Sequence, residues 1–220
     1  MLKRSRFSFV KACCPVLLLS ASLAATAQDN SPYSRYGLGD AMPNSNITTR
    51  SMGGISAAYS DGISINFNNP ASYSGFFASK EARSKKLESG RVVLDVGINI
   101  NNRTLIAPNT ANRFTSSDLL FSYIQVGVPL RKNWGLSFGI RPVSRISYLV
   151  NRGERLKDPS TGLNIDSAVT QFRGSGGSYL PTIGTGFSIG SLSLGVNAGY
   201  IFGNREATTL RSLINNDTTL

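Results

Sequence analysis

The sequence contains no histidine, and its two cysteines, Cys13 and Cys14, both lie close to the amino-terminus. Catalytic sites that use an imidazole or a thiol, and zinc sites, are therefore largely excluded. No run of lysine and arginine interleaved with aromatic residues accompanies the net charge of +11, which disfavours nucleic-acid binding. We expect no enzyme, no metal, no cofactor and no nucleic-acid partner.

Long apolar runs are also missing after the amino-terminus. Residues 1–27 hold four basic residues and no acid, then an apolar run from Ala12 to Leu19, then Ala25-Thr26-Ala27. This order is typical of a cleaved secretory signal, and the run is shorter than the roughly 20 residues of a membrane helix. We predict a signal peptide over 1–27, whose removal takes four charges from +11 and leaves an exported chain of net charge +7 without cysteine.

Alternation of apolar with small or polar residues is what the chain has in abundance. We predict strands over 91–101, 118–128, 134–149, 178–189 and 192–203, each long enough for the roughly 9–11 residues of a membrane-crossing strand. In the second strand the predicted faces are Leu120, Ile124, Val126 and Val128 against Leu119, Phe121, Tyr123, Gln125 and Gly127. In the third, Trp134, Leu136, Phe138 and Ile140 oppose Gly135, Ser137, Gly139 and Arg141.

Connections between these strands alternate in length. Long polar loops are predicted over 102–117 and 151–177, and short turns over 129–133 and 190–191. Outer-membrane β-barrels sort their loops in this way, with short turns in the periplasm. Because single-chain bacterial barrels begin at about 8 strands, residues 90–220 are predicted to be the first five strands of a longer chain. A barrel completed by a second chain is the alternative.

The polar stretch 28–89 has no sustained period and is predicted to be a plug inside the barrel, where irregular backbone is tolerated. It contains Asn68, Asn69, Pro70 and Ala71, and it opens with the sequence SPYSRYGLGD. A signal, this motif and alternating strands resemble the long-chain fatty-acid transporter (FadL-type) family, including FadL-like proteins of Bacteroidetes. The resemblance implies an all-β fold, an antiparallel transmembrane barrel of about fourteen strands with an amino-terminal hatch in its lumen.

Three sets of residues are candidates for function. Asn68, Asn69, Pro70 and Ala71 either gate the lumen or form a turn that wedges the hatch. Pro142 removes a ladder donor and marks either a kink, which the resemblance associates with a lateral opening, or the end of the membrane crossing. Asp95, Arg141 and Arg145 are predicted to face the lumen, as a ligand-carboxylate site or as an ion-pair network.

Two functions follow from these expectations. The first is a channel of the bacterial outer membrane for passive uptake of hydrophobic small molecules such as long-chain fatty acids. The second is a structural or docking barrel that serves a protein-secretion or surface-assembly machine. Outer-membrane lipid is a partner under both hypotheses, a hydrophobic ligand under the first, and other envelope proteins under the second.

Overall fold

The computed structural model describes residues 30–80, 82–83, 87–106, 113–157, 160, 162 and 164–214. The predicted signal peptide, residues 1–27, lies outside the described residues. The chain divides into two units, Met1–Asp29 with Asn101–Leu119, and Asn30–Ile100 with Leu120–Leu220. In the described part of the first unit, the Ser117 hydroxyl donates to Asn102 Oδ1 at 2.7 Å. The residues of the candidate site described below belong to the second unit.

Twelve elements follow one another along the described residues. The short ones are η1 (Pro32–Arg35), β1 (Asp40–Ala41), α2 (Ile47–Ser51), η2 (Pro70–Gly75), β2 (Ala78–Lys80) and β3 (Leu87–Gly90). The long strands are β4 (Val93–Ile106), β5 (Arg113–Arg131), β6 (Trp134–Lys157), β7 (Asn164–Ile189), β8 (Leu192–Gly199) and β9 (Phe202–Ile214). Among these residues, no helix is long and apolar enough to cross a membrane.

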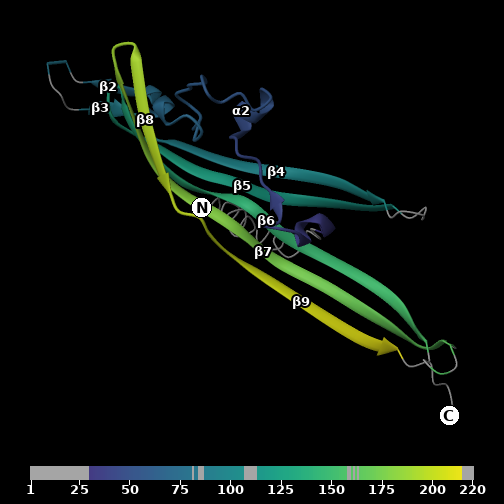
Figure 1. The fold of residues 1–220 in the computed structure, drawn as a ribbon. Coiled ribbons are helices and arrows are strands. Elements are labelled where there is room, and N and C mark those ends of the chain that lie inside the picture. Colours follow the sequence, from purple (N-terminus) through teal and green to yellow (C-terminus); the bar gives the residue numbers. More distant parts are fainter. Residues whose placement is uncertain are drawn as a thin grey trace, which may run out of the picture. The chain divides into compact units, whose positions relative to one another are not determined.

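The long strands form one antiparallel sheet in the order β4-β5-β6-β7-β8, with β1 added to β6 and β9 to β7 (Figure 1). The all-β prediction is confirmed at this level. The described strands form an open sheet, and β2 pairs with β3 apart from it.

Two predicted loops are largely strand. β4 continues to Ile106 and β5 begins at Arg113, while β6 continues to Lys157 and β7 begins at Asn164. These ends carry polar residues on both faces, so the alternation that reveals a half-buried strand is absent from them. The predicted fifth strand is interrupted between β8 and β9, opposite Pro181, which has no N–H to donate to the ladder.

Faces of β5 also differ from the prediction. Leu120 is 3% exposed and Tyr123 1%, whereas Phe121 is 43% exposed and Ile124 37%. Two successive residues, Ser122 and Tyr123, are both buried. The alternation therefore slips by one residue there, and Leu120 does not share a face with Ile124.

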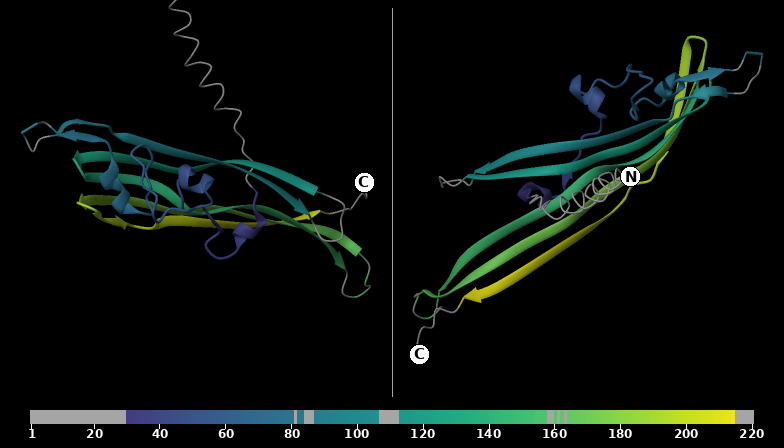
Figure 2. Two further views of the ribbon diagram at one scale, coloured as in Figure 1. Left: turned by 90° about the horizontal axis from the view of Figure 1, so that it is seen from above. Right: turned by 180° about the vertical axis from the view of Figure 1, so that it is seen from behind.

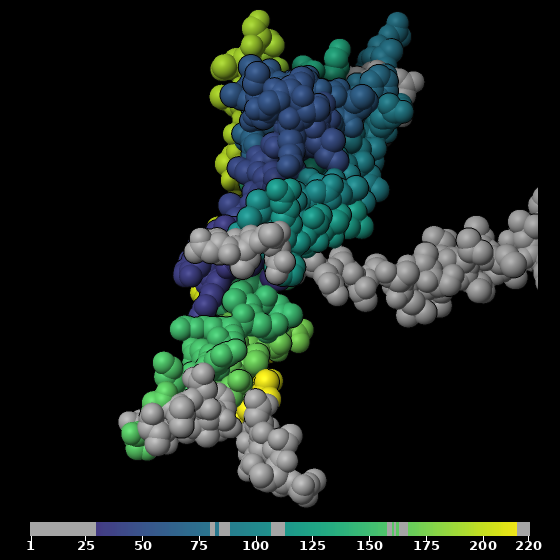
Figure 3. Space-filling view, turned by 90° about the vertical axis from the view of Figure 1, so that its right-hand side faces the viewer, coloured from purple at the N-terminus to yellow at the C-terminus, as the bar shows by residue number. Residues whose placement is uncertain are grey.

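Residues 30–77, which we call the N-terminal segment, lie on one face of β6, β7 and β8 (Figures 1 and 2). We name this the covered face, and the opposite one the open face. In Figure 3 the blue part of the N-terminal segment forms a compact group of atoms beside the teal and yellow-green strands. A small core of Ile65, Tyr73, Phe76 and Val93 joins the segment to the sheet.

Candidate functional site

Glycines of three neighbouring strands form a floor under η2. A Cβ built on Gly135 would lie 2.1 Å from the Tyr73 carbonyl oxygen, and one on Gly186 would lie 2.2 Å from that of Pro70. On Gly195 it would lie 2.3 Å from the Pro70 carbonyl carbon. Backbone therefore packs directly on backbone, and any larger residue on this floor must push η2 away.

Asn197 fastens the same segment from β8. Its amide nitrogen donates to the Phe67 carbonyl at 2.8 Å, and its Oδ1 accepts from the Tyr73 hydroxyl at 3.1 Å. Burial raises the pKa of Tyr73, whose side chain is 2% exposed. The phenol therefore keeps its proton and remains a donor to Asn197.

The predicted motif lies in this contact. Pro70 opens η2, where its missing N–H leaves no helical bond unmade. The Asn69 amide donates to the Ala57 carbonyl at 2.8 Å, and the Asn68 amide donates to the Asn44 carbonyl. Both asparagines thus tie the motif to other parts of the N-terminal segment.

Asp95 and Tyr123 hold the middle of the segment, at Ile47 and Ile65. The Asp95 carboxylate accepts from the Ile65 N–H at 3.0 Å and from the Tyr123 hydroxyl at 3.0 Å. The Tyr123 oxygen in turn accepts from the Ile47 N–H at 2.9 Å. Asp95 therefore serves as an anchor for backbone groups of the segment.

Arg141 lies elsewhere on the covered face, with its guanidinium carbon 4.4 Å from the centre of the Phe67 ring. One of its nitrogens, Nη1, is buried without a hydrogen-bond partner among the described residues, and so is Oε1 of Gln125. Gln125 is 1% exposed and stands opposite Gly139, two residues from Arg141. The sequence analysis missed Gln125, although a polar residue on the predicted lumen side was visible in the alternation.

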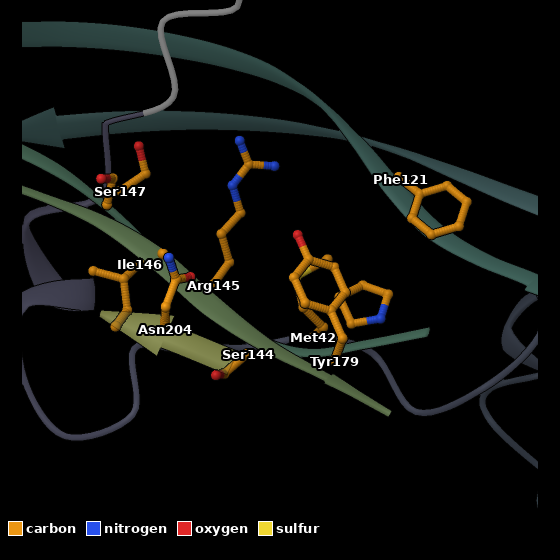
Figure 4. Close-up of a pocket in the computed structure, with 11 residues that line it drawn as sticks. Met42, Phe121, Ser144, Arg145, Ile146, Ser147, Tyr179 and Asn204 are labelled. Carbon is orange, nitrogen blue, oxygen red and sulfur yellow. The ribbon is translucent and has the colours of Figure 1, made fainter. Parts of the chain in front are cut away.

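Arg145 does not share a face with Arg141. The β6–β7 register shifts by one residue between Pro142 and Ser144, and a one-residue shift exchanges the two faces of a strand. Ser144 then faces Ser178 with 2.7 Å between their hydroxyl oxygens. Arg145 is the next residue of the strand and therefore lies on the opposite, open face, on the same side as Tyr179 (Figure 4). The prediction that the two arginines point the same way is wrong, because the alternation was counted through this bulge.

The edge of β6 changes its partner at the same level. β5 pairs with β6 from Ile124 opposite Ile140 down to Arg131 opposite Trp134. Beyond Ile140 the same edge carries β1, with Asp40 opposite Arg145 and Ala41 opposite Ser144. We call this stretch of β6, residues 143–149, the exchanged edge.

A cavity of about 360 Å³ adjoins the exchanged edge (Figure 4). Met42, Phe121 and Tyr179 lie toward one end of it and Ser147 toward the other. Pro142, the residue predicted to mark a kink, also lines it. It combines apolar and aromatic side chains with polar ones, among them Arg145 and Asn204.

These features define an antiparallel all-β protein with one covered and one open sheet face. A model of the BamG family matches residues 9–219, so the chain belongs to the BamG family. No curated protein and no solved structure matches it. The resemblance to FadL-type transporters is therefore corrected: alternating strands and a short Asn-Pro-Ala motif are shared features that did not identify the family.

Proposed function

We propose that this protein is an outer-membrane component of the protein-assembly (BAM) machinery, and that it docks to other envelope proteins there. Membership of the BamG family, over residues 9–219, is the observation that carries the proposal. The family name favours the docking hypothesis over passive uptake of fatty acids. Catalysis has no part in the proposed role.

The open face supports a position in the membrane. Large apolar side chains there stay exposed on strand after strand: Leu94 is 65% exposed, Ile183 55% and Val196 63%. Leu194 and Phe138 are exposed as well. Exposing such an apolar face to water costs free energy, whereas exposing it to lipid does not. We therefore propose that β4 to β8 form part of a barrel wall.

Aromatic residues mark both limits of this apolar face. Trp134 stands opposite Phe187 beside the short turn, and Tyr179 and Phe202 lie together with ring centres 6.1 Å apart. From Tyr179 to Phe187 the strand rises about 26 Å, or about 20 Å after a tilt of about 40°. Outer-membrane barrels have an apolar band of about 25 Å between aromatic girdles.

The N-terminal segment supports docking rather than passage. Proposed as a hatch, it rests on the wall through the glycine floor and is fastened by Asn197 and Asp95. A ligand route along these strands would have to break backbone contacts on three of them. We propose that the hatch braces the wall, leaving exposed parts of the protein for partners.

The test is co-purification of the full-length protein from outer membranes in mild detergent. We expect subunits of the assembly machinery to elute with it, and we expect reconstituted vesicles to show no added uptake of a labelled long-chain fatty acid. Recovery of the protein without any such subunit, together with fatty-acid uptake above that of empty vesicles, would refute the proposal.

A further inference from the structure

Backbone groups along the exchanged edge of β6 are satisfied by the N-terminal segment in place of β5. The Met42 N–H donates to the Val143 carbonyl at 2.9 Å, and the Ser31 N–H donates to the Ser147 carbonyl at 2.8 Å. With the two β1 pairs, successive rungs of the edge are occupied. The edge is therefore aligned to accept an extended chain.

At the far end of the exchanged edge, side chains of the N-terminal segment make the hydrogen bonds that the backbone of a neighbouring strand would make. The Asn30 amide accepts from the Leu149 N–H at 3.0 Å and donates to the Leu149 carbonyl at 3.2 Å. Ser34 Oγ accepts from the Ser147 N–H at 3.0 Å. An amide and a hydroxyl can supply these bonds, but an incoming strand would supply the same bonds from its backbone.

Few apolar groups would be lost if residues 30–42 left the edge. Tyr33 is 74% exposed, Tyr36 72% and Leu38 81%. Away from the edge, Arg205 donates to the carbonyls of Arg35 and Gly37 at 2.9 and 3.2 Å. The guanidinium carbon of Arg35 also lies 4.3 Å from the centre of the Phe172 ring. Displacement therefore exchanges hydrogen bonds for equivalent ones. It would also uncover Ile146, which is 4% exposed and lies against Gly39, so an incoming strand must cover this side chain again.

We propose that the exchanged edge is the docking surface for an extended polypeptide segment of an assembly partner, and that residues 30–42 occupy it until the partner displaces them. Strand addition takes its affinity from main-chain hydrogen bonds and its specificity from pockets for alternate side chains. The cavity beside Met42 is such a pocket. Its Phe121 and Tyr179 suit an apolar or aromatic side chain of the incoming strand.

The inference rests on the proposed function, and a reversible lock tests it. Ala41 and Ser144 are opposite each other, and antiparallel partners stand about 4.5–5.5 Å apart at Cα, within the range of a disulfide. The exported chain is predicted to lack cysteine, so Ala41→Cys with Ser144→Cys would form a single bridge. Asn151→Cys with Gln171→Cys, opposite each other on β6 and β7, is the matched control on the edge that should not open.

We expect oxidised Ala41→Cys/Ser144→Cys protein to retain assembly subunits at least about tenfold less than the same protein after reduction, and the control pair to show no difference. Equal retention with and without the lock would overturn the inference and make residues 30–42 a permanent part of the wall. Loss of every subunit even from reduced and wild-type protein would instead refute the proposed function.

A second variant guards against a lock that distorts the protein. Asn30→Ala with Ser34→Ala removes the side chains that imitate a strand, so the segment competes less well for its own edge. Retention of assembly subunits should rise about tenfold. A fall in retention would overturn the inference, because it would mean that the docked segment itself supports binding.

Discussion

Replacing Gly186 by alanine tests whether the N-terminal segment rests on the sheet as closely as the glycine floor indicates. The new Cβ would lie 2.2 Å from the Pro70 carbonyl oxygen and 3.2 Å from Tyr73 Cβ. Neither the oxygen nor the carbon is at the end of a flexible side chain. The segment must therefore lift by nearly 1 Å to restore an ordinary contact.

The size of the effect follows from two opposing contributions. Overpacking of this kind costs about 1–3 kcal/mol, while alanine restricts the unfolded chain and returns about 0.4–1 kcal/mol. The neighbouring contacts at Gly135 and Gly195 leave η2 no free direction along the floor. We expect a net loss of about 1–2 kcal/mol, or about a 5- to 30-fold shift of the docked equilibrium.

Hydrogen exchange of the backbone amides of residues 64–76 in detergent-solubilised protein measures this equilibrium. Gly186→Ala should speed their exchange by that factor while leaving β6 and β7 protected. Gly153→Ala is the matched control, since a Cβ there meets nothing within 4 Å. Equal protection of the segment in Gly186→Ala and Gly153→Ala would refute the close packing.

Three further predictions concern the same contacts and the open face. Asn197→Ala leaves the Phe67 carbonyl and the Tyr73 hydroxyl without their partner, and should lower the free energy of unfolding by about 1–3 kcal/mol in urea titrations; an unchanged midpoint would contradict the role of Asn197. Phe138→Arg on the open face should destabilise the protein in lipid vesicles by about 2–4 kcal/mol, whereas Asn151→Arg on the polar end of β6 should change it by less than about 0.5 kcal/mol. The pKa of Tyr73 is raised in the folded protein. The stability that the protonated Tyr73 side chain contributes is therefore complete below the unfolded pKa of about 10 and is lost as pH rises through the folded pKa. Wild type should lose more stability than Tyr73→Phe between pH 9 and 11, and equal losses in the two proteins would contradict this.

Local pattern predicted the strands, because alternation is set by residues that are close in sequence. Leu194 and Val196 face away from the covered side as their spacing indicates. The contact between Asn30 and Leu149 joins residues 119 positions apart. No local period signals such a pairing, so the exchanged edge was beyond sequence reasoning.

Among the candidate site residues, Arg145 is the one whose predicted face differs from the structure, for a related reason. The faces of Asp95 and Arg141 came from uninterrupted alternation, and both side chains do contact the N-terminal segment. Arg145 lies beyond the bulge, where the extra residue reverses which alternate positions face the covered side. Pro142 correctly predicted where β6 becomes irregular. Whether an extra residue is inserted there depends on the pairing with β7, which the local sequence does not show.

Deleting Val143 tests whether the bulge alone sets the face on which Arg145 lies. Pro142 stands opposite Tyr179 and Ser144 opposite Ser178, so Val143 is the extra residue. Its deletion should leave Arg145 on the open face and a continuous ladder, at a cost of about 1 kcal/mol for the lost bond from Met42.

Deleting Ile140 instead removes a residue that the ladder needs. Arg141 would turn from the Phe67 ring to the open face, where an arginine in lipid costs about 2–4 kcal/mol. Urea unfolding in vesicles should therefore rank the deletion of Val143 close to wild type and that of Ile140 far below it. Val143 has no partner on β7, so its deletion leaves every other pair of the ladder in place. Ile140 does have a partner, so its deletion moves Arg141 to the other face. If both deletions were equally damaging, the register shift at Pro142 would not be the reason that the two arginines lie on different faces.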